Sequence, residues 1–484
     1  MVFNVILFAA FFLASNFVAD ATIGINWGRH TAQRLVPATV VDLLLQNKVP
    51  EARIYTSQED ILKAFVGSRI NLTLTIFNIQ NIAGINLARK WVQEKAPYFE
   101  SANIRRVYLG SHVFRVGLTD KPFLHMAIDT LETLQYAINE AGYGDQIKVT
   151  FPHTESVLND NLTRPSDAEF NEAIKEEMAR TLRILKQNNA PFVVEVFPIA
   201  DVAYHNYDPE FAFIDNKSPF VIRDINNTIY TNVFEFIHDC FVWALIKAGV
   251  PGMEIIIGQV GWPTDGFPGA NASTAERFFK GLLPYVASNK GTPMRPGAPI
   301  HSYVHALTDE NKMPYYYPFA RHWGIYRSNG EPKYKIDLTG QGRDIYPTKA
   351  KGIMHMPERW CVFNEDTTDT QKVKKKFDEA CTRADCTSLA MGGSCSQLTF
   401  AQNMSYAFNM YFQANFQDEE ACNFEGLGKV VTADPSVGGC VFPVEVVRGE
   451  QEGDVAAEGS RLYQMPSCGI FVVLVSMLWA LFYD

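Results

Sequence analysis

Residues 256–263 read Ile256-Ile257-Gly258-Gln259-Val260-Gly261-Trp262-Pro263, an apolar strand that runs into Gly-Trp-Pro. We predict this strand to be the seventh of eight that alternate with amphipathic helices between residues 22 and 346. Eight strands with helices between them indicate an α/β fold with a closed parallel (β/α)8 TIM barrel, not an open sheet. The predicted strands are Ile23–Trp27, Arg53–Tyr55, Leu72–Ile76, Arg106–Leu109, Lys148–Thr150, Phe192–Val196, Glu254–Val260 and Ser302–Leu307.

Long helices are predicted over Pro122–Ala141, Glu169–Gln187 and Asn232–Ala248. A further helix is expected after Ser273, because Ser273 and Glu276 have capping-box spacing in front of an apolar run. In a barrel of this kind the carboxyl ends of the strands face the functional site. Candidate functional residues are therefore sought where the strands end.

A cluster of cysteines marks a second, small domain, which we place at residues 358–447. Its members are Cys361, Cys381, Cys386, Cys395, Cys422 and Cys440. An even number in one short segment suits disulfides of a secreted protein, although the sequence alone leaves the pairing open. A zinc site is disfavoured because no CxxC pair occurs and no His stands at ligand spacing, so we expect neither metal nor other cofactor. Cys240, in a predicted helix, is expected to be a buried thiol.

Both ends of the chain resemble processing signals. Residues 1–19 are mostly apolar, with Ala19 and Ala21 as small residues for cleavage, which is typical of a secretory signal peptide; a membrane-spanning anchor is the alternative. Residues 460–484 carry an apolar tail typical of a glycosylphosphatidylinositol (GPI) attachment signal that is removed, with a retained tail anchor as the alternative. Residues 448–459 are acidic and predict a disordered tether, and residues 347–357 predict a linker.

The net charge bears on the class of partner, and the glycosylation sequons bear on secretion. The net charge of −10 argues against nucleic acid, whereas a neutral polysaccharide would be indifferent to it. N-glycosylation sequons begin at Asn71, Asn161, Asn216, Asn226, Asn271 and Asn403. Asn71 opens a predicted strand, whereas the others stand near loops or turns and would be usable on a secreted protein. We expect a monomer that contacts the membrane only through its lipid anchor.

Two strand ends carry distinctive motifs, Val107–Phe114 at the fourth predicted strand and Ile256–Gly266 at the seventh. Both motifs resemble the catalytic strands of plant family-17 glycoside hydrolases, the endo-1,3-β-glucanases. Further matches are Ile23–Gly28, Gly291–Gly297, Asp309–Asn311 and Arg321–Ile325. The order and spacing of these motifs along the chain make the resemblance specific.

The cysteine-rich segment resembles carbohydrate-binding module family 43, which follows many of these enzymes. The resemblance rests on motifs such as Trp360-Cys361-Val362 and Ala384-Asp385-Cys386-Thr387. It implies the bridges Cys361–Cys422, Cys381–Cys386 and Cys395–Cys440.

The resemblance also implies that both catalytic acids are replaced. The family's first motif ends in Asn-Glu, whose Glu is the acid/base, and this chain has Ser111-His112 there. The second motif carries the nucleophile Glu, and this chain has Gln259. Retaining hydrolysis needs one carboxyl group to protonate the leaving oxygen and another to attack the sugar. His112 could donate a proton near its usual pKa of about 6.5, but an amide cannot attack, so no catalytic pair is intact. Thr56 likewise stands where the family has a carboxylate.

A sugar-binding groove is implied by residues that match the family's cleft. The aromatic candidates are Trp27, Tyr55, Trp262, Tyr303 and Trp323, and the polar candidates are Asn26, Ser111 and Glu310. The alternative for the aromatic residues is core packing, and the alternative for Glu310 is a salt bridge.

One new carboxylate stands near the nucleophile position. The family has Asn on the sixth strand, where this chain has Glu195, and we expect that strand to lie beside the strand of Gln259. Neighbouring strands lie about 4.8 Å apart, so Glu195 could act as a displaced nucleophile with His112 as the acid. The alternative, which we favour, is a hydrogen-bonded or ion-paired carboxylate inside the barrel.

These observations lead to one principal hypothesis and two alternatives. The principal hypothesis is a GPI-anchored β-1,3-glucan-binding protein of the cell surface or cell wall that is inactive or strongly impaired as a hydrolase. The first alternative is an active endo-1,3-β-glucosidase rebuilt around His112 and Glu195. The second is a cell-wall interaction scaffold whose sugar groove is vestigial.

Overall fold

The computed structural model describes residues 20–447, except 33, 118, 161, 315–317, 366 and 368. The predicted signal peptide, the sequon at Asn161, the predicted tether and the predicted GPI signal all lie outside the described residues. The described residues belong to one compact unit. Within the described ranges, no helix combines the length and apolar character needed to span a bilayer.

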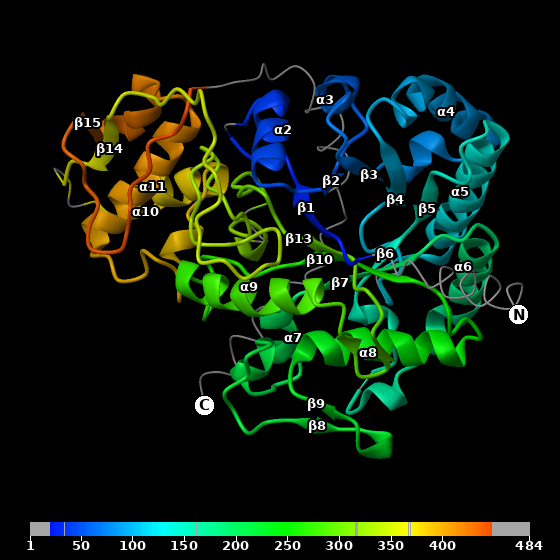
Figure 1. The fold of residues 1–484 in the computed structure, drawn as a ribbon. Coiled ribbons are helices and arrows are strands. Elements are labelled where there is room, and N and C mark those ends of the chain that lie inside the picture. The colour runs from blue at the N-terminus through cyan, green and yellow to red at the C-terminus, as the bar shows by residue number, and fades with distance from the viewer. Residues whose placement is uncertain are drawn as a thin grey trace, which may run out of the picture. The chain divides into compact units, whose positions relative to one another are not determined.

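A closed parallel barrel forms the larger part of this unit (Figure 1). Its strands are β1 (Ile23–Trp27), β2 (Glu51–Ile54), β3 (Asn71–Ile76), β4 (Ile104–Leu109), β5 (Lys148–Thr150), β6 (Pro152–His153), β7 (Phe192–Val196), β10 (Ile255–Val260) and β13 (Ser302–Val304). Their order is β5-β4-β3-β2-β1-β13-β10-β7-β6. Only Phe151 separates β5 from β6, so the two ends of this order meet in one interrupted strand and the sheet closes. The predicted (β/α)8 barrel is thereby confirmed.

Helices cover the outside of the barrel, as Figure 1 shows for α4, α5 and α6 beside β3, β4 and β5. The helices are α2 (Pro37–Gln46), α3 (Glu59–Phe65), α4 (Ile85–Phe99), α5 (Lys121–Glu140), α6 (Lys175–Gln187), α7 (Pro198–Tyr204), α8 (Val233–Lys247) and α9 (Ala272–Ala287). The predicted start of α6 at Glu169 is wrong, because a 3₁₀ turn over Glu172–Ile174 precedes the helix. The capping box of α9 is also misplaced in the prediction: Asn271 is the N-cap and pairs with Thr274.

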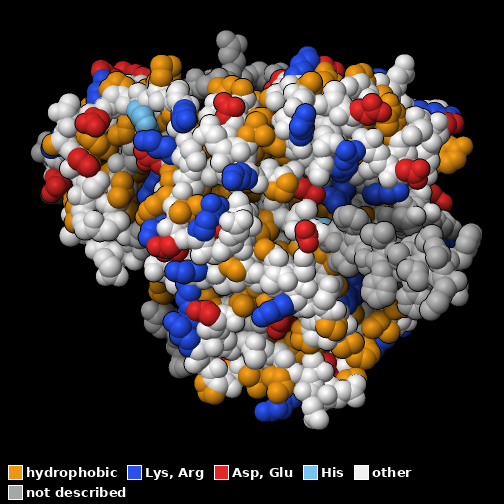
Figure 2. Space-filling view, viewed as in Figure 1, with side chains coloured by type: hydrophobic (Ala, Val, Ile, Leu, Met, Phe, Trp, Pro, Cys, Tyr) orange, Lys and Arg blue, Asp and Glu red, His pale blue; other side chains and the backbone are white. Residues whose placement is uncertain are grey.

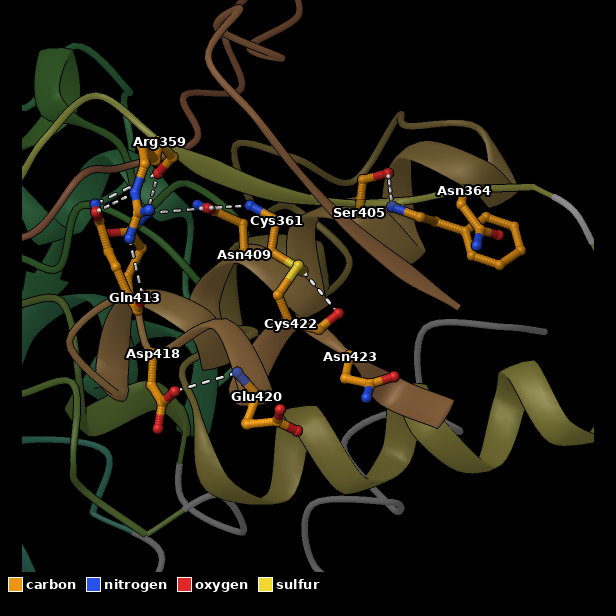
Figure 3. Close-up of a disulfide and its surroundings, with 12 residues drawn as sticks. Arg359, Cys361, Asn364, Ser405, Asn409, Gln413, Asp418, Glu420, Cys422 and Asn423 are labelled. Atoms are coloured by element: carbon orange, nitrogen blue, oxygen red, sulfur yellow. Dashed lines mark hydrogen bonds between the residues drawn. A yellow bond between two sulfur atoms is a disulfide. The ribbon is translucent and has the colours of Figure 1, made fainter. Parts of the chain in front are cut away.

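The small domain contains β14 (Trp360–Phe363), β15 (Gly428–Val431), α10 (Thr370–Arg383) and α11 (Phe400–Ala414). Its two strands are antiparallel, and α11 packs on β14 through contacts such as Phe363 against Phe408. Three disulfides join Cys361–Cys422, Cys381–Cys386 and Cys395–Cys440, the same pairs that the resemblance implies. Figure 3 shows the first of these beside Asn409 and Gln413 of α11.

Candidate functional site

Alternate side chains of β2, and that of Tyr55 directly after it, fill the barrel interior in successive layers. Glu51, Arg53 and Tyr55 are two residues apart, so they face the same side of the strand. Glu51 accepts a hydrogen bond from the Tyr303 hydroxyl, and the Tyr55 hydroxyl accepts one from Gln259. Because β2 runs from Glu51 toward Tyr55, Tyr55 lies at the carboxyl end of the barrel, where a functional site is expected.

A β-bulge at Gly258 sets the position of Gln259. The register between β10 and β7 shifts by one residue there, so that Gln259 pairs with Glu195. The bulge turns the Gly258 carbonyl inward, where it accepts hydrogen bonds from Asn26 Nδ2 at 3.0 Å and from Arg53 Nη1 at 3.2 Å. The loss of pairing at the bulge is thus offset by bonds from two interior side chains.

The side chain of Gln259 is bonded within the barrel and 8% of the residue is exposed. Its Nε2 donates to the Tyr55 hydroxyl at 2.7 Å. A Cβ atom at the preceding Gly258 would lie 2.5 Å from Val193 Cγ1, so the bulge that aims Gln259 requires glycine.

A buried ion pair occupies the centre of the barrel. Arg53 Nη1 lies 2.8 Å from Glu195 Oε1, and both side chains are 0% exposed. Arg53 Nε also donates to Thr75 Oγ1 at 3.0 Å. The second carboxylate oxygen of Glu195 lies 3.2 Å from His112 Nε2. Glu195 is therefore ion-paired in the barrel interior, the arrangement that we favoured.

His112 lies at the mouth of the barrel with its side chain 31% exposed. Its backbone is in the left-handed region, with φ of 55°, which histidine tolerates better than most residues. Burial lowers the pKa of the imidazole, and the nearby Glu195 carboxylate offsets only part of this effect. The neutral form of the ring is therefore favoured in the folded protein. Ser111 beside it is exposed.

Aromatic rings surround this centre on the carboxyl side. Tyr55 stacks on Phe77 with ring centroids 5.9 Å apart. Phe197 lies 5.5 Å from the Trp323 ring and 6.3 Å from His305. Phe77, Phe197 and His305 were not among the predicted site residues. Each follows the end of its strand by one residue, and that position is the signal that would have identified them.

The other predicted aromatic residues lie deeper. Trp27, Trp262 and Tyr303 are at most 3% exposed. The Trp262 indole donates to the Gly269 carbonyl at 3.2 Å, and its ring lies 4.7 Å from that of Phe213. In this structure these three side chains pack the interior and offer little surface to a ligand. Sugar contact by them stays a prediction.

The predicted polar residues Glu310 and Asn26 are also buried within the protein. Glu310 Oε1 accepts a hydrogen bond from His30 N at 3.0 Å, and burial raises the pKa of this carboxyl. The carboxylate lies so close to Gly28 that a Cβ there would be 2.0 Å from Oε1. Asn26 is fully buried, and its Oδ1 lacks a hydrogen-bond partner. The Thr56 hydroxyl accepts a backbone hydrogen bond at 3.1 Å.

The described sequons differ in access. Asn226 and Asn271 are exposed. Asn216 Nδ2 donates to two carbonyl oxygens, Asn403 Nδ2 donates to one, and Asn71 bonds to Glu51. Occupancy of these sites stays a prediction.

Possible metal ligands and the free thiol can be stated for the described part of the chain. Among the residues described, no trio of His, Cys, Asp or Glu is arranged to hold a metal ion. Cys240 is a free, buried thiol whose pKa is raised by burial.

Comparison with known sequences and structures gives consistent matches. Residues 23–338 match the profile of glycosyl hydrolases family 17, and residues 359–429 match the X8 domain. Glucan endo-1,3-beta-glucosidase 8 of Arabidopsis thaliana is 36% identical over 468 residues, covering 95% of this chain and 94% of that protein. Glucan endo-1,3-beta-glucosidase 5 of the same plant is 37% identical over 486 residues, covering 97% and 98%. Among solved structures, CJP38, a beta-1,3-glucanase and allergen of Cryptomeria japonica pollen, is 27% identical with a TM-score of 0.62, covering 66% of this chain and 99% of that one.

Proposed function

This chain belongs to the glycosyl hydrolases of family 17, and from that membership we propose that it binds β-1,3-glucan while being inactive or strongly impaired as a hydrolase. The ligand class follows from relatives named as glucan endo-1,3-beta-glucosidases. The loss of hydrolysis follows from the chemistry of the barrel centre.

The observation that carries the proposal is that both carboxylate oxygens of Glu195 are bonded within the barrel. A nucleophilic carboxylate must bring a free oxygen to the sugar. Both Glu195 oxygens are occupied, one by Arg53 and the other by His112, and the side chain is 0% exposed. At the family's nucleophile position Gln259 presents an amide that is bonded to Tyr55. Neither group can attack a sugar.

We place the glucan across the carboxyl ends of the strands. The half-buried rings of Tyr55, Phe77 and Phe197 suit stacking on sugar faces, and the exposed Ser111 can bond a hydroxyl. Trp323, itself only 3% exposed, contacts the Phe197 ring edge to face. On the face that Figure 2 shows, basic and acidic side chains are interspersed without a large area of one charge, which suits a neutral polysaccharide.

We further propose that the protein is monomeric, is secreted, and is held at the cell surface or wall by a GPI anchor. The support is the pair of terminal signals in the sequence, together with three disulfides in the X8 domain, which need an oxidising compartment. The X8 domain supplies a second glucan-binding surface on the same chain, which raises avidity.

The test uses purified protein spanning residues 20–447 and the β-1,3-glucan laminarin. We expect retention on insoluble β-1,3-glucan and no release of reducing ends above a protein-free blank. Laminarin hydrolysis that Glu195→Ala abolishes would overturn the proposal. Glu51→Gln is the matched control, because Glu51 is also a barrel carboxylate paired with an arginine. If both variants lost hydrolysis equally, the loss would reflect folding.

The second candidate function is a working endo-1,3-β-glucosidase with a rebuilt site. The 3.2 Å contact between His112 and Glu195 favours it, because it brings a proton donor and a carboxylate together. A mechanism-based fluorosugar would then leave a covalent adduct on Glu195, detectable by peptide mass. A wall scaffold with a vestigial groove would instead bind no β-glucan at all.

A further inference from the structure

The X8 domain contacts the barrel through the loop that follows β10. Asp265, 8% exposed, accepts hydrogen bonds from Ser388 Oγ at 2.8 Å, Ser394 N at 2.9 Å and Ser394 Oγ at 2.7 Å. One barrel carboxylate thus binds two segments of the small domain. Hydrogen bonds to a charged group are about twice as strong as neutral ones, so this contact is specific.

A chain of buried ions joins the same domain to the loop after β13. Asp385 lies 3.1 Å from Arg321 Nη1 and 3.0 Å from His322 Nε2. His322 Nδ1 lies 3.5 Å from Asp309, which is 2.7 Å from Lys333 Nζ. Burial disfavours a charged His322, but the Asp385 and Asp309 carboxylates outweigh it and raise the pKa of this imidazole to about 10. The His322 imidazole is therefore charged near pH 7.

The shapes of the two surfaces also match closely. A Cβ at Gly266 would lie 2.2 Å from Thr387 Cγ2, and a Cβ at Gly392 would lie 3.2 Å from the Pro268 backbone. Glycine on each side permits the close approach. Contacts of this kind are typical of a packed interface.

The linker is bonded at both of its ends. Thr348 N donates to Asn47 Oδ1 at 2.9 Å on the barrel side. On the other side Met356 N donates to the Glu445 carbonyl at 2.9 Å, and Val447 N donates to the Met354 carbonyl at 2.7 Å. Residues 347–357 are therefore hydrogen-bonded to the barrel near one end and to the small domain near the other.

The docking loops belong to the same end of the barrel as the candidate site. Thr264 N donates to the His322 carbonyl at 2.8 Å, which ties the two loops together. His322 precedes Trp323, whose ring lies 5.5 Å from Phe197 at the site. The small domain is thus docked on loops of which one contacts Phe197 of the candidate site through Trp323.

We propose that the barrel and the X8 domain act as one preorganised body that binds a single β-1,3-glucan chain along both parts. This inference rests on the proposed function. Two binding sites joined by a flexible linker raise the effective concentration of the ligand at the second site. Two sites held at a fixed spacing also avoid the entropy cost of ordering the two domains on binding. Only a ligand long enough to span both sites gains from the fixed spacing. Affinity then rises steeply once the oligosaccharide reaches that length.

The experiment compares protein spanning residues 20–447 with its Asp265→Lys variant, which places a cation against the Ser388 and Ser394 donors. The exposed Asp145→Lys is the control for the charge change. A protease site inserted at Gly352, where a Cβ would meet nothing within 4 Å, allows the linker to be cut in all three proteins. If Asp265→Lys fails to fold, Ser388→Ala combined with Ser394→Ala removes the same hydrogen bonds without new charge.

After cleavage we expect the two halves to co-elute in the parent and in Asp145→Lys, and to separate in Asp265→Lys. Calorimetry with β-1,3-linked glucose oligomers measures the affinities. For short oligomers, the affinities of the three proteins should agree within about twofold. Long oligomers should bind Asp265→Lys at least tenfold more weakly than the parent. The inference is overturned, and the proposed function is not, if the two halves of the cleaved parent separate. The same holds if affinity depends on oligomer length equally in all three proteins. Absence of binding at every length overturns the proposed function as well.

Discussion

Two arginine–glutamate pairs lie inside the same barrel, and they differ in what surrounds them. Arg106 and Glu51, 3.2 Å apart, share the Tyr303 hydroxyl near the amino end, and the arginine side chain is 18% exposed. Arg53 and Glu195, 2.8 Å apart, are both 0% exposed. The second pair has His112 above it, at the mouth of the barrel.

Position in the barrel therefore decides what a buried charge can do. The amino-end pair lies where residues of such barrels serve stability. The central pair lies beside Gln259, where a reaction would need a free carboxylate, and Arg53 holds that carboxylate in place. With one oxygen on Arg53 and the other on His112, the buried Glu195 carboxylate has no free oxygen to bring to a sugar.

The largest effect is expected from rebuilding the chemistry. His112→Glu with Gln259→Glu restores the family's acids but places two carboxylates at paired positions 195 and 259, which raises one pKa. Adding Glu195→Asn removes that conflict and frees Arg53 to keep the new Glu ionised. We expect at least tenfold more laminarin hydrolysis from the triple variant than from the double. Equal rates would mean that the Arg53–Glu195 pair does not suppress catalysis.

The second largest effect is expected from replacing each arginine, because the two ion pairs should differ in the stability that is lost. Arg53→Met leaves Glu195 buried without its counter-ion and should cost about 3–5 kcal/mol of unfolding free energy. Arg106→Met should cost about 1–3 kcal/mol, because Glu51 keeps its hydrogen bond from Tyr303. Urea denaturation measures both. A larger loss for Arg106→Met would contradict the comparison.

Removing one hydroxyl from each layer gives a smaller and more selective effect. The Tyr303 hydroxyl contacts Glu51, Thr73 and Arg106 in the interior, so Tyr303→Phe should cost about 1–3 kcal/mol and leave glucan affinity within about twofold. Tyr55→Phe should cost about 1 kcal/mol or less, yet weaken glucan binding severalfold. Calorimetric titration beside thermal unfolding distinguishes these outcomes. If the two variants behaved alike, Tyr55 would be a purely structural residue.

The smallest effect concerns pH. The lowered pKa of His112 means that its neutral form is favoured in the folded state, so this contribution is present above pH 6.5 and is lost as pH falls through the folded value. Asn also tolerates the left-handed backbone, so His112→Asn should fold and be less acid-sensitive than the parent. Between pH 7 and pH 5 we expect the difference in unfolding free energy to change by less than about 1 kcal/mol. A change in the opposite direction would mean that the imidazole is charged in the fold.

The sequence predicted the barrel because apolar strands and amphipathic helices have distinct local periods, and seven of the eight strands were placed within two residues of their observed bounds. The last strand was predicted three residues too long, to Leu307 where it ends at Val304. The disulfide pairs came from the resemblance, because spacing alone does not select partners.

The site was less predictable because its contacts are not local. Arg53 and Glu195 are 142 residues apart, and no short motif announces their pair. The bulge at Gly258 depends on Asn26 and Arg53 across the barrel. Trp262 and Tyr303 stand at the expected positions along the chain, but the interior packing that buries them was not readable from the sequence.

The pairing of Met354 and Met356 with Val447 and Glu445 has a mechanical consequence. A force applied between the barrel and residue 447 loads these short backbone bonds first, in series with the linker. While they hold, the load reaches the barrel without passing through the disulfide-bridged helices of the small domain. Once they part, tension falls on Cys440 and its bridge to Cys395, which cannot lengthen without breaking a covalent bond. The molecule therefore has a weak, non-covalent connection in front of a strong, covalent one.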